Sequence, residues 1–374
     1  MAGGGIFGVT AALELRRRGH EVVLIDPKPA PNSRASSTDI SKLIRMDYGN
    51  DRAYTAMMDQ CFFGWALWNQ RWRRPLYHET GMLMLSGESL RRGQFEGDSF
   101  FALQDHPACA PVRVTASEIE RRGWRGYVDG YLNPRAGWAE SGEVVRTLTE
   151  EAESCGVVIR QASVLGLEGD TRVAGLHTTG GTVDAACVVV ATGAWIPTLL
   201  PELADRISVV GQPVLHFRSD STQWRAGAFP PWAADIAQTG WYGFPGLNDG
   251  TLKIANHGPG VPCDPANTPG VPEAWEGRCR RFLEAHLPAL ATAPLVGSRL
   301  CLYADSFDGD FFIARHPHRS GLVVSGAGSG HGFKFAPLLG SLTADAVEAR
   351  PNPWLRRFRW RSRGPRKTEG ARHS

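Results

Sequence analysis

The sequence lacks the features that mark disulfide-bonded, zinc-binding and membrane-spanning proteins. Its seven cysteines are odd in number and scattered, and no two form a Cys-x-x-Cys pair, which argues against a disulfide framework and a zinc site. No apolar run approaches the roughly 20 residues that a membrane helix needs, and the N-terminus does not have the form of a signal peptide. We therefore expect a cytoplasmic protein with no metal site and no membrane partner.

An excess of one charge is confined to the C-terminus. The formal net charge is +3, but residues 356–374 hold eight lysines and arginines and a single acid, so the rest of the chain is mildly acidic. We expect residues 351–374 to form a solvated, poorly ordered basic tail. Contact with nucleic acid is the weaker alternative, because no DNA- or RNA-binding motif accompanies the charge.

Length and composition are those of an ordinary soluble globular protein. With 374 residues, of which 42% are hydrophobic and 21% charged, the chain is long enough for two domains and a large core. No internal repeat is visible in the sequence.

The strongest local pattern lies at the N-terminus, where Gly3, Gly5 and Gly8 have Gly-x-Gly-x-x-Gly spacing. An apolar helical face follows, Gly19 ends it, and a β-like run leads to Asp26. Glycines let main-chain N–H groups approach a pyrophosphate at a helix N-terminus, and an acid about 20 residues further on binds a ribose hydroxyl. The combination predicts dinucleotide binding; the alternative is a glycine turn before an ordinary helix.

The fingerprint should follow a buried central strand, but only Met1 and Ala2 precede it. Two explanations are open: the chain as numbered begins late, or another segment fills the position of that strand. The gap bears on the stability and activity of this polypeptide more than on its ancestry.

A polar loop and two helices are predicted after Asp26. The small polar run 33–37, which includes Ser36, suits a loop against a phosphate or a cofactor ring. If residues 40–48 are helical, Lys42 and Arg45 share one face, and the spacing alone slightly favours a solvated charged helix. Residues 51–74 also have a helical pattern, and aromatic side chains at that spacing indicate a core-facing helix.

The rest of the chain alternates between sheet-like and helical segments. Short β-like runs separated by Gly and Pro between residues 77 and 138 indicate a second domain inserted into the first. A buried strand at 187–191 runs into Thr192-Gly193, where a close main-chain approach suits a dinucleotide. The other predicted elements are a helix at 143–153, a strand at 157–159, a β-meander before residue 187, β-rich sequence over 207–300, a helix at 278–287, a strand pair at 311–314 and 322–325, and a helix after Pro337.

Several of these segments together resemble the flavin-dependent amine oxidase family of monomeric sarcosine oxidase, N-methyltryptophan oxidase, pipecolate oxidase and the fructosyl-amino-acid oxidases. The most specific match is Cys301-Leu-Tyr, followed by a Phe-Ile segment and by Gly-x-Gly-His-Gly-Phe-Lys ending at Lys334. The resemblance spans almost the whole chain up to about residue 350. The matching pieces are 3–26, 41–49, 191–195, 241–257, 301–317 and 328–335.

The resemblance implies an α/β (α+β) fold of the glutathione-reductase/D-amino-acid-oxidase type, with two domains and the basic tail 351–374. The Rossmann-like FAD-binding domain would comprise residues 1–76, 140–206 and 301–350. The mixed β-sheet substrate-binding domain would comprise residues 77–139 and 207–300.

The resemblance also implies FAD as the cofactor. Cys301 matches the cysteine that forms a thioether to the 8-methyl group of the isoalloxazine, although a lone cysteine is usually a small buried hydrophobe. Lys253 matches the lysine over the flavin N5 side, where an ammonium stabilises charge on reduced oxygen; from sequence alone, a strand lysine is expected to face solvent. The other matched cofactor positions are Gly3, Gly5, Gly8, Asp26, Ser36, Lys42, Gly193, Gly328, Gly330 and Phe333.

Two cations are implied to bind the substrate carboxylate. Arg45 and Lys334 match that pair, and an arginine fork with a lysine point charge suits an α-amino acid. Taken alone, His257 would be interpreted as a structural histidine. The positions that line the pocket or contact the amine are occupied by Tyr242, His257, Tyr303 and Gly330.

The implied reaction is oxidation of an amine by hydride transfer to flavin N5, giving an imine that water hydrolyses, while O2 is reduced to H2O2. The expected partners are a small-molecule amine or amino acid and O2, with the protein a monomer or a weak homo-oligomer. Two alternatives are an FAD-dependent amine dehydrogenase that uses another electron acceptor and a truncated, non-catalytic flavoprotein.

Two features depart from the sarcosine oxidase pattern. Lys42 stands where arginine is usual under the flavin, and Arg-Phe-Arg-Trp-Arg lies near the end of the chain. Both resemble the fructosyl-amino-acid and saccharopine oxidases. We therefore expect a bulkier secondary amine derived from an amino acid, or a primary amine in a specialised pathway, rather than sarcosine.

Overall fold

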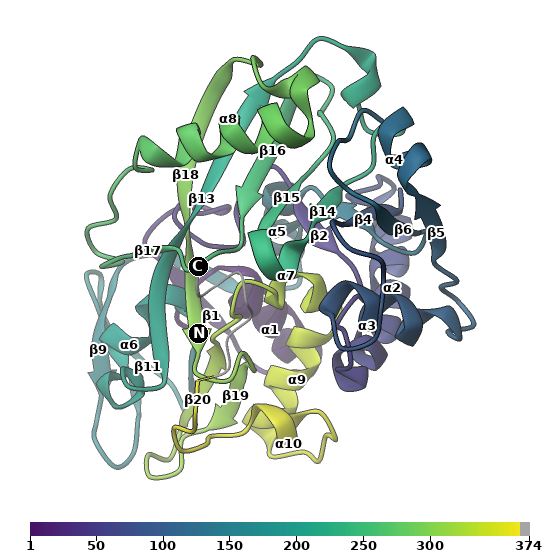
Figure 1. The fold of residues 1–374 in the computed structure, drawn as a ribbon. Coiled ribbons are helices and arrows are strands. Elements are labelled where there is room, and N and C mark those ends of the chain that lie inside the picture. Colours follow the sequence, from purple (N-terminus) through teal and green to yellow (C-terminus); the bar gives the residue numbers. More distant parts are fainter. Residues whose placement is uncertain (367–374) are drawn as a thin grey trace. The chain divides into compact units, whose positions relative to one another are not determined.

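The computed structural model describes residues 1–366 (Figure 1). These residues divide into two units. The first unit comprises residues 1–40, 140–210 and 302 onward, and the second comprises residues 41–139 and 211–301. Residues 41–76, predicted to belong with the FAD-binding domain, lie in the second unit. They do so because Lys42–Ile44 pairs with Gly137–Ala139 of that unit.

The main sheet of the first unit is mostly parallel. β1 pairs in parallel with β8, β12 pairs in parallel with β20, and β19 adds an antiparallel edge to β20. A separate antiparallel sheet has the order β11-β10-β9. The bounds are β1 Val23–Asp26, β8 Val158–Gln161, β9 Val164–Glu168, β10 Gly175–Thr178, β11 Gly181–Asp184, β12 Val188–Val190, β19 Phe312–Arg315 and β20 Leu322–Gly326.

Ala2 lies between β1 and β12, where the sequence predicts a central strand. It forms parallel bridges to both Ile25 and Val190. Its N–H donates to the carbonyl of Val189 at 2.8 Å, and its own carbonyl accepts from the N–H of Ala191 at 2.8 Å. The start of the chain therefore continues the hydrogen bonding of the sheet at the position of the predicted central strand.

Helices of the first unit flank this sheet. α1 packs against α9, and Arg18, just after α1, forms ion pairs with Asp345 at 2.7 Å and Glu348 at 2.8 Å. α5 also packs against α1. The bounds are α1 Ile6–Arg17, α5 Ser141–Ser154, α6 Ile196–Leu199, α9 Ala336–Glu348 and α10 Leu355–Phe358.

The second unit is built on a large, mostly antiparallel sheet with the order β17-β13-β16-β15-β14-β4-β6-β5 and with β18 paired to β13. A smaller sheet has the order β2-β7-β3. The unit boundary falls within the long strands β13 (Ile207–Arg218) and β18 (Leu295–Ser306). The other strands are β2 Lys42–Ile44, β3 Tyr77–His78, β4 Met82–Ser86, β5 Val112–Thr115, β6 Asp129–Asn133, β7 Gly137–Ala139, β14 Trp232–Ala234, β15 Trp241–Gly243, β16 Thr251–Asn256 and β17 Val261–Pro262.

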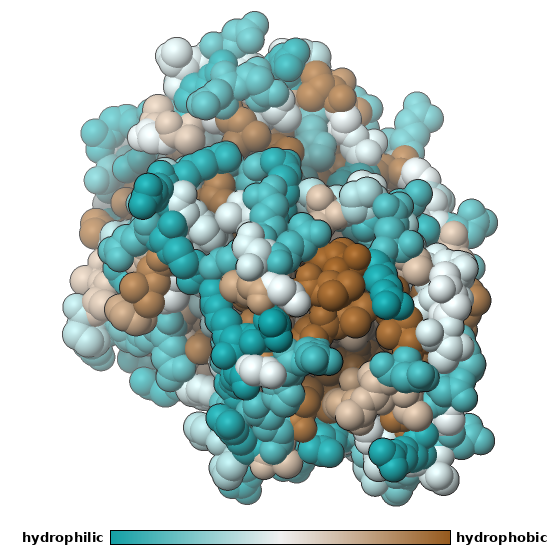
Figure 2. Space-filling model, turned by 180° about the vertical axis from the view of Figure 1, so that it is seen from behind, coloured by the Kyte–Doolittle hydropathy of each residue, from teal (hydrophilic) through white to brown (hydrophobic). Residues whose placement is uncertain are grey.

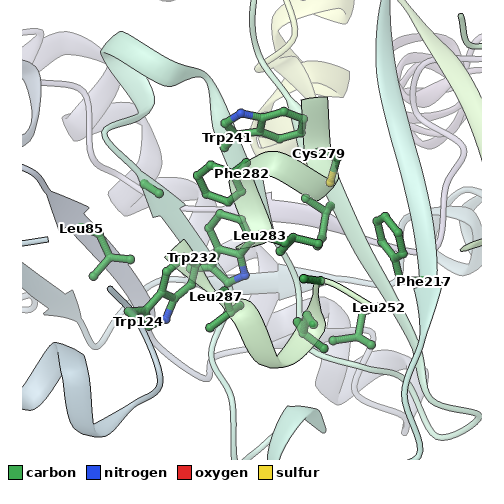
Figure 3. Close-up of a cluster of buried hydrophobic side chains, with 14 of the residues drawn as sticks. Leu85, Trp124, Phe217, Trp232, Trp241, Leu252, Cys279, Phe282, Leu283 and Leu287 are labelled. Atoms are coloured by element: carbon green, nitrogen blue, oxygen red, sulfur yellow. The ribbon is translucent and has the colours of Figure 1, made fainter. Parts of the chain in front are cut away.

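An aromatic core joins α8 to this sheet (Figure 3). Phe282 of α8 stacks between Trp232 and Trp241, with ring centroids 5.8 and 5.2 Å away. Burying such large rings supplies much of the hydrophobic stabilisation of the unit. The helices of the second unit are α2 Arg52–Trp72, α3 Phe95–Gln104, α4 Ala116–Arg121, α7 Ile236–Thr239 and α8 Ala274–His286.

Most of the long predicted elements are present, but the helix predicted at residues 40–48 is wrong. That segment contains the strand β2, because its main chain pairs with β7 and this long-range pairing overrides the local charge spacing. Lys42 and Arg45 therefore do not share a helix face. In α2, the core prediction holds for Phe62 and Trp65, whereas Phe63 is 68% exposed.

The prediction of a solvated tail from residue 351 is also wrong for the described part. Residues 354–366, here called the C-terminal strap, belong to the first unit and pack against the rest of it. Phe358 is fully buried, and Arg361 forms an ion pair with Asp308 at 2.6 Å. The rest of the predicted tail, residues 367–374, lies outside the described residues.

The surface drawn in Figure 2 is mostly hydrophilic, with an apolar area near its centre. Among the described residues, no helix combines the length and the apolar character that crossing a membrane requires.

Candidate functional site

The glycine turn before α1 has a geometry that only glycine permits at two positions. Gly3 has φ +98°, and a Cβ atom on it would lie 2.6 Å from the carbonyl oxygen of Ala191. A Cβ on Gly8 would lie 1.8 Å from the carbonyl oxygen of Gly3. The turn is therefore packed tightly between β12 and α1, as the glycines of a dinucleotide fingerprint require.

Asp26 lies at the end of β1 and contacts this turn. One carboxylate oxygen accepts the N–H of Gly4 at 2.8 Å, and the other accepts the side-chain amide of Asn32 at 2.8 Å. These hydrogen bonds fix the side chain of Asp26 beside the N-terminus of α1. This is the position from which such an acid binds a ribose.

The polar loop after Asp26 reaches the first turn of α1 through Ser37, the neighbour of the predicted Ser36. Ser37 Oγ accepts the N–H of Ile6, the first residue of α1, at 3.2 Å. Arg34 lies over the ring of Trp195 with 5.0 Å to the centroid. Sequence reasoning missed both residues, although the predicted loop 33–37 contains them.

The segment after β12 carries a buried polar atom that is not hydrogen-bonded. Thr192 Oγ1 is buried without a partner among the described residues, and a Cβ on the neighbouring Gly193 would meet nothing within 4 Å. Buried hydroxyls are normally hydrogen-bonded, so an unsatisfied one beside open space indicates a place for a polar ligand.

The glycine-rich segment 327–335 brings together four more predicted residues. A Cβ on Gly330 would lie 2.1 Å from the ring of Tyr303, and one on Gly328 would lie 3.2 Å from Phe7. Phe333 and Lys334 are buried, and Lys334 Nζ donates to the carbonyl of His331 at 3.0 Å. The segment is therefore compact, and its lysine is fixed rather than solvated.

In the second unit, Lys253 is fully buried on β16. Its Nζ donates to the carbonyl of Ser41 at 2.6 Å and lies 4.8 Å from the ring centroid of Phe244. Moving an ammonium out of water costs free energy, and a protein bears this cost mainly where the charge is paired or has a function. The solvent-facing position expected from sequence alone is wrong, because β16 is an inner strand of the sheet.

Lys42, the residue after Ser41, contacts the predicted attachment cysteine. Its Nζ lies 3.5 Å from the Sγ of Cys301, which is buried on β18. Ser41 Oγ is buried and has no hydrogen-bond partner among the described residues. The 41–42 dipeptide thus links Lys253 and Cys301, which are far apart in sequence.

Arg45 is held by the loop that follows β2. Its guanidinium donates to the main-chain carbonyl of Asp47 and lies 5.3 and 5.8 Å from the ring centroids of Tyr48 and Phe95. Two aromatic faces and a carbonyl restrict the orientation of the fork. Such restriction favours bidentate binding of a carboxylate.

A buried network that sequence reasoning missed supports this loop. The carboxylate of Asp47 is fully buried and accepts from Tyr131 Oη at 2.7 Å and Asn133 Nδ2 at 2.9 Å. Burial and the Asp47 charge raise the pKa of Tyr131 well above its ordinary value, so the phenol remains a donor. Both partners lie on β6, more than 80 residues away in sequence.

Replacing Asp47 by asparagine is expected to destabilise the protein by about 1–3 kcal/mol. An amide can accept from Tyr131 or from Asn133 but not from both, so one buried donor loses its partner. Urea unfolding measures the effect. The control is Asp105→Asn, which makes the same change at an exposed position of the same unit; equal midpoints for the two variants would contradict the assigned network.

The remaining predicted residues, Tyr242 and His257, also lie in the second unit. Tyr242 is half-buried on β15, with its ring centroid 5.9 Å from that of Phe244. His257 follows β16, and its N–H donates to the carbonyl of Gly240 at 2.7 Å. Tyr242 on β15 and His257 just after β16 are therefore positioned by two strands that neighbour each other in the large sheet.

The predicted residues are thus divided between the two units. The nucleotide turn, Thr192-Gly193 and the segment 327–335 with Tyr303 belong to the first unit, and the other six residues belong to the second. Within residues 1–366, no group of three or more His, Cys, Asp or Glu side chains is arranged to hold a metal ion. The six in the second unit are Lys42, Arg45, Tyr242, Lys253, His257 and Cys301.

Comparison with known proteins gives matches over nearly the whole chain. Residues 2–346 match the family described as FAD dependent oxidoreductase. Monomeric sarcosine oxidase from Bacillus sp. (strain B-0618) is 27% identical over 358 residues, covering 91% of this chain and 90% of the relative. L-saccharopine oxidase from Schizosaccharomyces pombe is 24% identical over 418 residues, covering 96% of this chain and 92% of the relative.

A solved structure is similar over most of its length. The fructosyl amine:oxygen oxidoreductase Amadoriase I from Aspergillus fumigatus is 25% identical, with a TM-score of 0.81, covering 96% of this chain and 88% of that chain. The predicted fold class is confirmed.

Proposed function

The chain belongs to the FAD dependent oxidoreductase family and is an FAD-dependent enzyme, and we propose that it oxidises a secondary amine of an amino-acid derivative with O2 as the acceptor. The observation that carries this proposal is the buried ammonium of Lys253 at Ser41, next to the Lys42–Cys301 contact. A fully buried cation is costly as structure alone, and together with a thiol at the same dipeptide it suits a redox site.

The residues of the first unit fit FAD. The tight glycine turn, the fixed Asp26 carboxylate and the buried hydroxyl of Thr192 provide main-chain donors, a ribose acceptor and an unsatisfied polar group. When bound, FAD supplies the acceptor for the hydride of the amine and passes the electrons to O2, giving H2O2.

Cys301 is the residue that we propose to attach the flavin covalently. Its buried Sγ accepts a hydrogen bond from the ammonium of Lys42 at 3.5 Å, which fixes the position of the sulfur. The thiolate is the nucleophilic form that bond formation requires.

Lys253 would act on oxygen. A buried ammonium stabilises negative charge that develops nearby, and its hydrogen bond to Ser41 fixes its position before the reaction. This role favours an oxidase over a dehydrogenase.

Arg45 and Lys334 would bind the substrate carboxylate. Arg45 offers a fork restricted by Tyr48 and Phe95, and Lys334 offers a fixed point charge. Proximity to two cations also favours the neutral amine that the oxidation requires. Gly330, packed on Tyr303, would offer its carbonyl to the amine, and Tyr242 and His257 would shape the pocket.

The substrate class follows from the relatives and from Lys42. The names of the sarcosine, saccharopine and fructosyl amine oxidases imply that their substrates carry a secondary amine, which in sarcosine and saccharopine belongs to an amino acid. Lysine at position 42 resembles the saccharopine and fructosyl-amino-acid enzymes. We therefore propose an N-substituted amino acid with a substituent larger than methyl.

A screen for peroxide release tests this function. Purified protein is assayed with N-methyl, cyclic, N-carboxyalkyl and fructosyl amino acids, and the larger N-substituents are expected to give the highest kcat/KM. A yellow protein that reduces its flavin with an amine but reoxidises slowly in O2 would be a dehydrogenase. A colourless protein without activity would be a non-catalytic relative.

A further inference from the structure

We propose that the C-terminal strap is a positioning element of the flavin and substrate site. It would act through Phe311, which contacts both the first turn of α1 and the segment that carries Lys334. The part that concerns Lys334 rests on the proposed function. The part that concerns the nucleotide turn rests only on FAD binding.

The strap is anchored by Arg361, whose three guanidinium nitrogens are all hydrogen-bonded. Nε and Nη2 form a bidentate pair with the carboxylate of Asp308, each at 2.6 Å. Nη1 donates to the carbonyl of Phe311 and Nη2 to that of Asp310, both at 2.9 Å. The guanidinium also lies 4.0 Å from the ring centroid of Phe312. This pairing is the strong, geometrically specific form of an arginine–carboxylate contact.

The electrostatics of Asp308 agree with a firm anchor. Burial raises the pKa of this carboxyl, but the hydrogen bonds and charge of Arg361 outweigh that effect and hold the pKa below its ordinary value. Arg357 adds a second ion pair in the same turn, with Nε 2.7 Å from Asp310 Oδ1. Two arginines of the strap therefore bind one turn, 306–310.

Phe358 connects the anchored strap to Phe311. Its side chain is fully buried, and its ring stacks on that of Phe311 with centroids 4.9 Å apart. Phe311 is also fully buried and precedes β19 directly. The ring of Phe358 thus packs directly against Phe311 and restricts its position.

Phe311 connects to the two functional segments on its other sides. Its ring lies 5.7 Å from Phe7 in the first turn of α1, and 5.0 and 5.6 Å from His331 and Phe335. His331 Nε2 donates to the carbonyl of Gly309 at 3.0 Å, and its own carbonyl accepts from Lys334 Nζ. The turn held by the arginines is therefore bonded to the residue that fixes Lys334.

The packing leaves little freedom for these segments to shift independently. A Cβ on Gly332 would lie 2.9 Å from the ring of Phe7, so the loop and α1 are in close contact. Displacing a binding group by 1 Å can lower a rate by about 100-fold even when the change lies far from the reacting atoms. Loss of Phe358 would free Phe311 to move, and both segments with it.

The test compares Phe358→Ala and Arg361→Ala with Arg359→Ala. Arg359 is an exposed arginine of the same strap whose side chain bonds only weakly, at 3.4 Å, to Arg356. For holoenzyme oxidising a carboxylated amine, the first two variants are expected to raise KM about tenfold with a smaller change in kcat. The same amine lacking its carboxylate should show a much smaller rise in KM. Arg359→Ala should match the wild type in both assays.

A second measurement is independent of amine oxidation. The temperature at which flavin fluorescence appears on heating should fall in Phe358→Ala and Arg361→Ala, and not in Arg359→Ala. Should Arg361→Ala fail to fold, Arg361→Lys keeps the charge without the fork, and Phe358→Leu keeps apolar volume without the ring. Both are expected to give smaller effects in the same direction.

The outcomes separate the two proposals. If the wild type oxidises no amine, the proposed function fails, while the temperature at which flavin fluorescence appears still decides the part of the inference that concerns the nucleotide turn. If the variants lower that temperature but raise KM equally for both amines, the part that concerns Lys334 is wrong. If they match Arg359→Ala throughout, the whole inference is wrong.

Discussion

Replacing Lys253 by methionine is expected to slow the reoxidation of reduced flavin by O2 about 100- to 1,000-fold, the range for loss of one preorganised stabilising group. Methionine has a similar length and keeps the buried volume, but it removes the ammonium that donates to Ser41. Reduction of oxygen builds negative charge and should suffer most. Stopped-flow mixing of reduced protein with O2 measures the effect, and anaerobic mixing with substrate measures the other half-reaction.

The matched control is Lys28→Met, which removes one positive charge at an exposed position. It should leave both half-reactions unchanged. If Lys253→Met slows the anaerobic reduction as much as the reoxidation, Lys253 is not specific to oxygen, and its burial needs a structural explanation.

Replacing Cys301 by alanine is expected to turn any covalent flavin into one that acid precipitation releases completely. The Sγ of Cys301 is buried 3.5 Å from Lys42 Nζ, so the substitution removes the one thiol that the structure places beside this cation among the described cysteines. The absorbance of flavin in the acid pellet and in the supernatant gives the result directly. Activity should fall but not vanish, because the remaining contacts still hold FAD.

Cys279→Ala is the control for this experiment. Cys279 is another buried cysteine of the second unit, but burial raises the pKa of its thiol to about 12, which disfavours the nucleophilic thiolate. Its substitution should leave the flavin in the pellet. Covalent flavin retained in Cys301→Ala would assign the attachment to another residue, and acid-extractable flavin in the wild type would exclude a covalent link.

The sequence predicts best where the structure is determined by neighbours along the chain. The glycine turn, α1 and β1 follow from residues 3–26, and the periodicity of residues 51–74 and 143–153 predicts α2 and α5 correctly. In each case, the side chains that decide the conformation lie within a few turns of one another.

Prediction from the sequence fails where a residue far away along the chain determines the local conformation. β2 exists because β7 pairs with it, almost 100 residues later, and the strap is ordered because Asp308 and Phe311 lie beneath it. The charge pattern of residues 356–366 is the same for a solvated tail and for an anchored strap. Only the positions of the acidic partners distinguish the two.

The same limit applies to the candidate site. The sequence around a strand lysine does not show whether the side chain is buried. The role of Lys253 was therefore predicted from the family resemblance and not from the neighbouring residues. Asp47 could not be found at all, because Tyr131 and Asn133 reach it from β6. A buried carboxylate with two distant donors is visible only in three dimensions.

The order of segments in the first unit has a consequence for synthesis. β12 needs β20 as its neighbour, and α1 needs α9, yet both partners lie in residues 302–366. During synthesis, the N-terminal turn therefore cannot complete its packing until residues 302–366 have left the ribosome. The nascent protein should acquire FAD only after that point, and a ribosome stalled before residue 322 should display a chain that binds none.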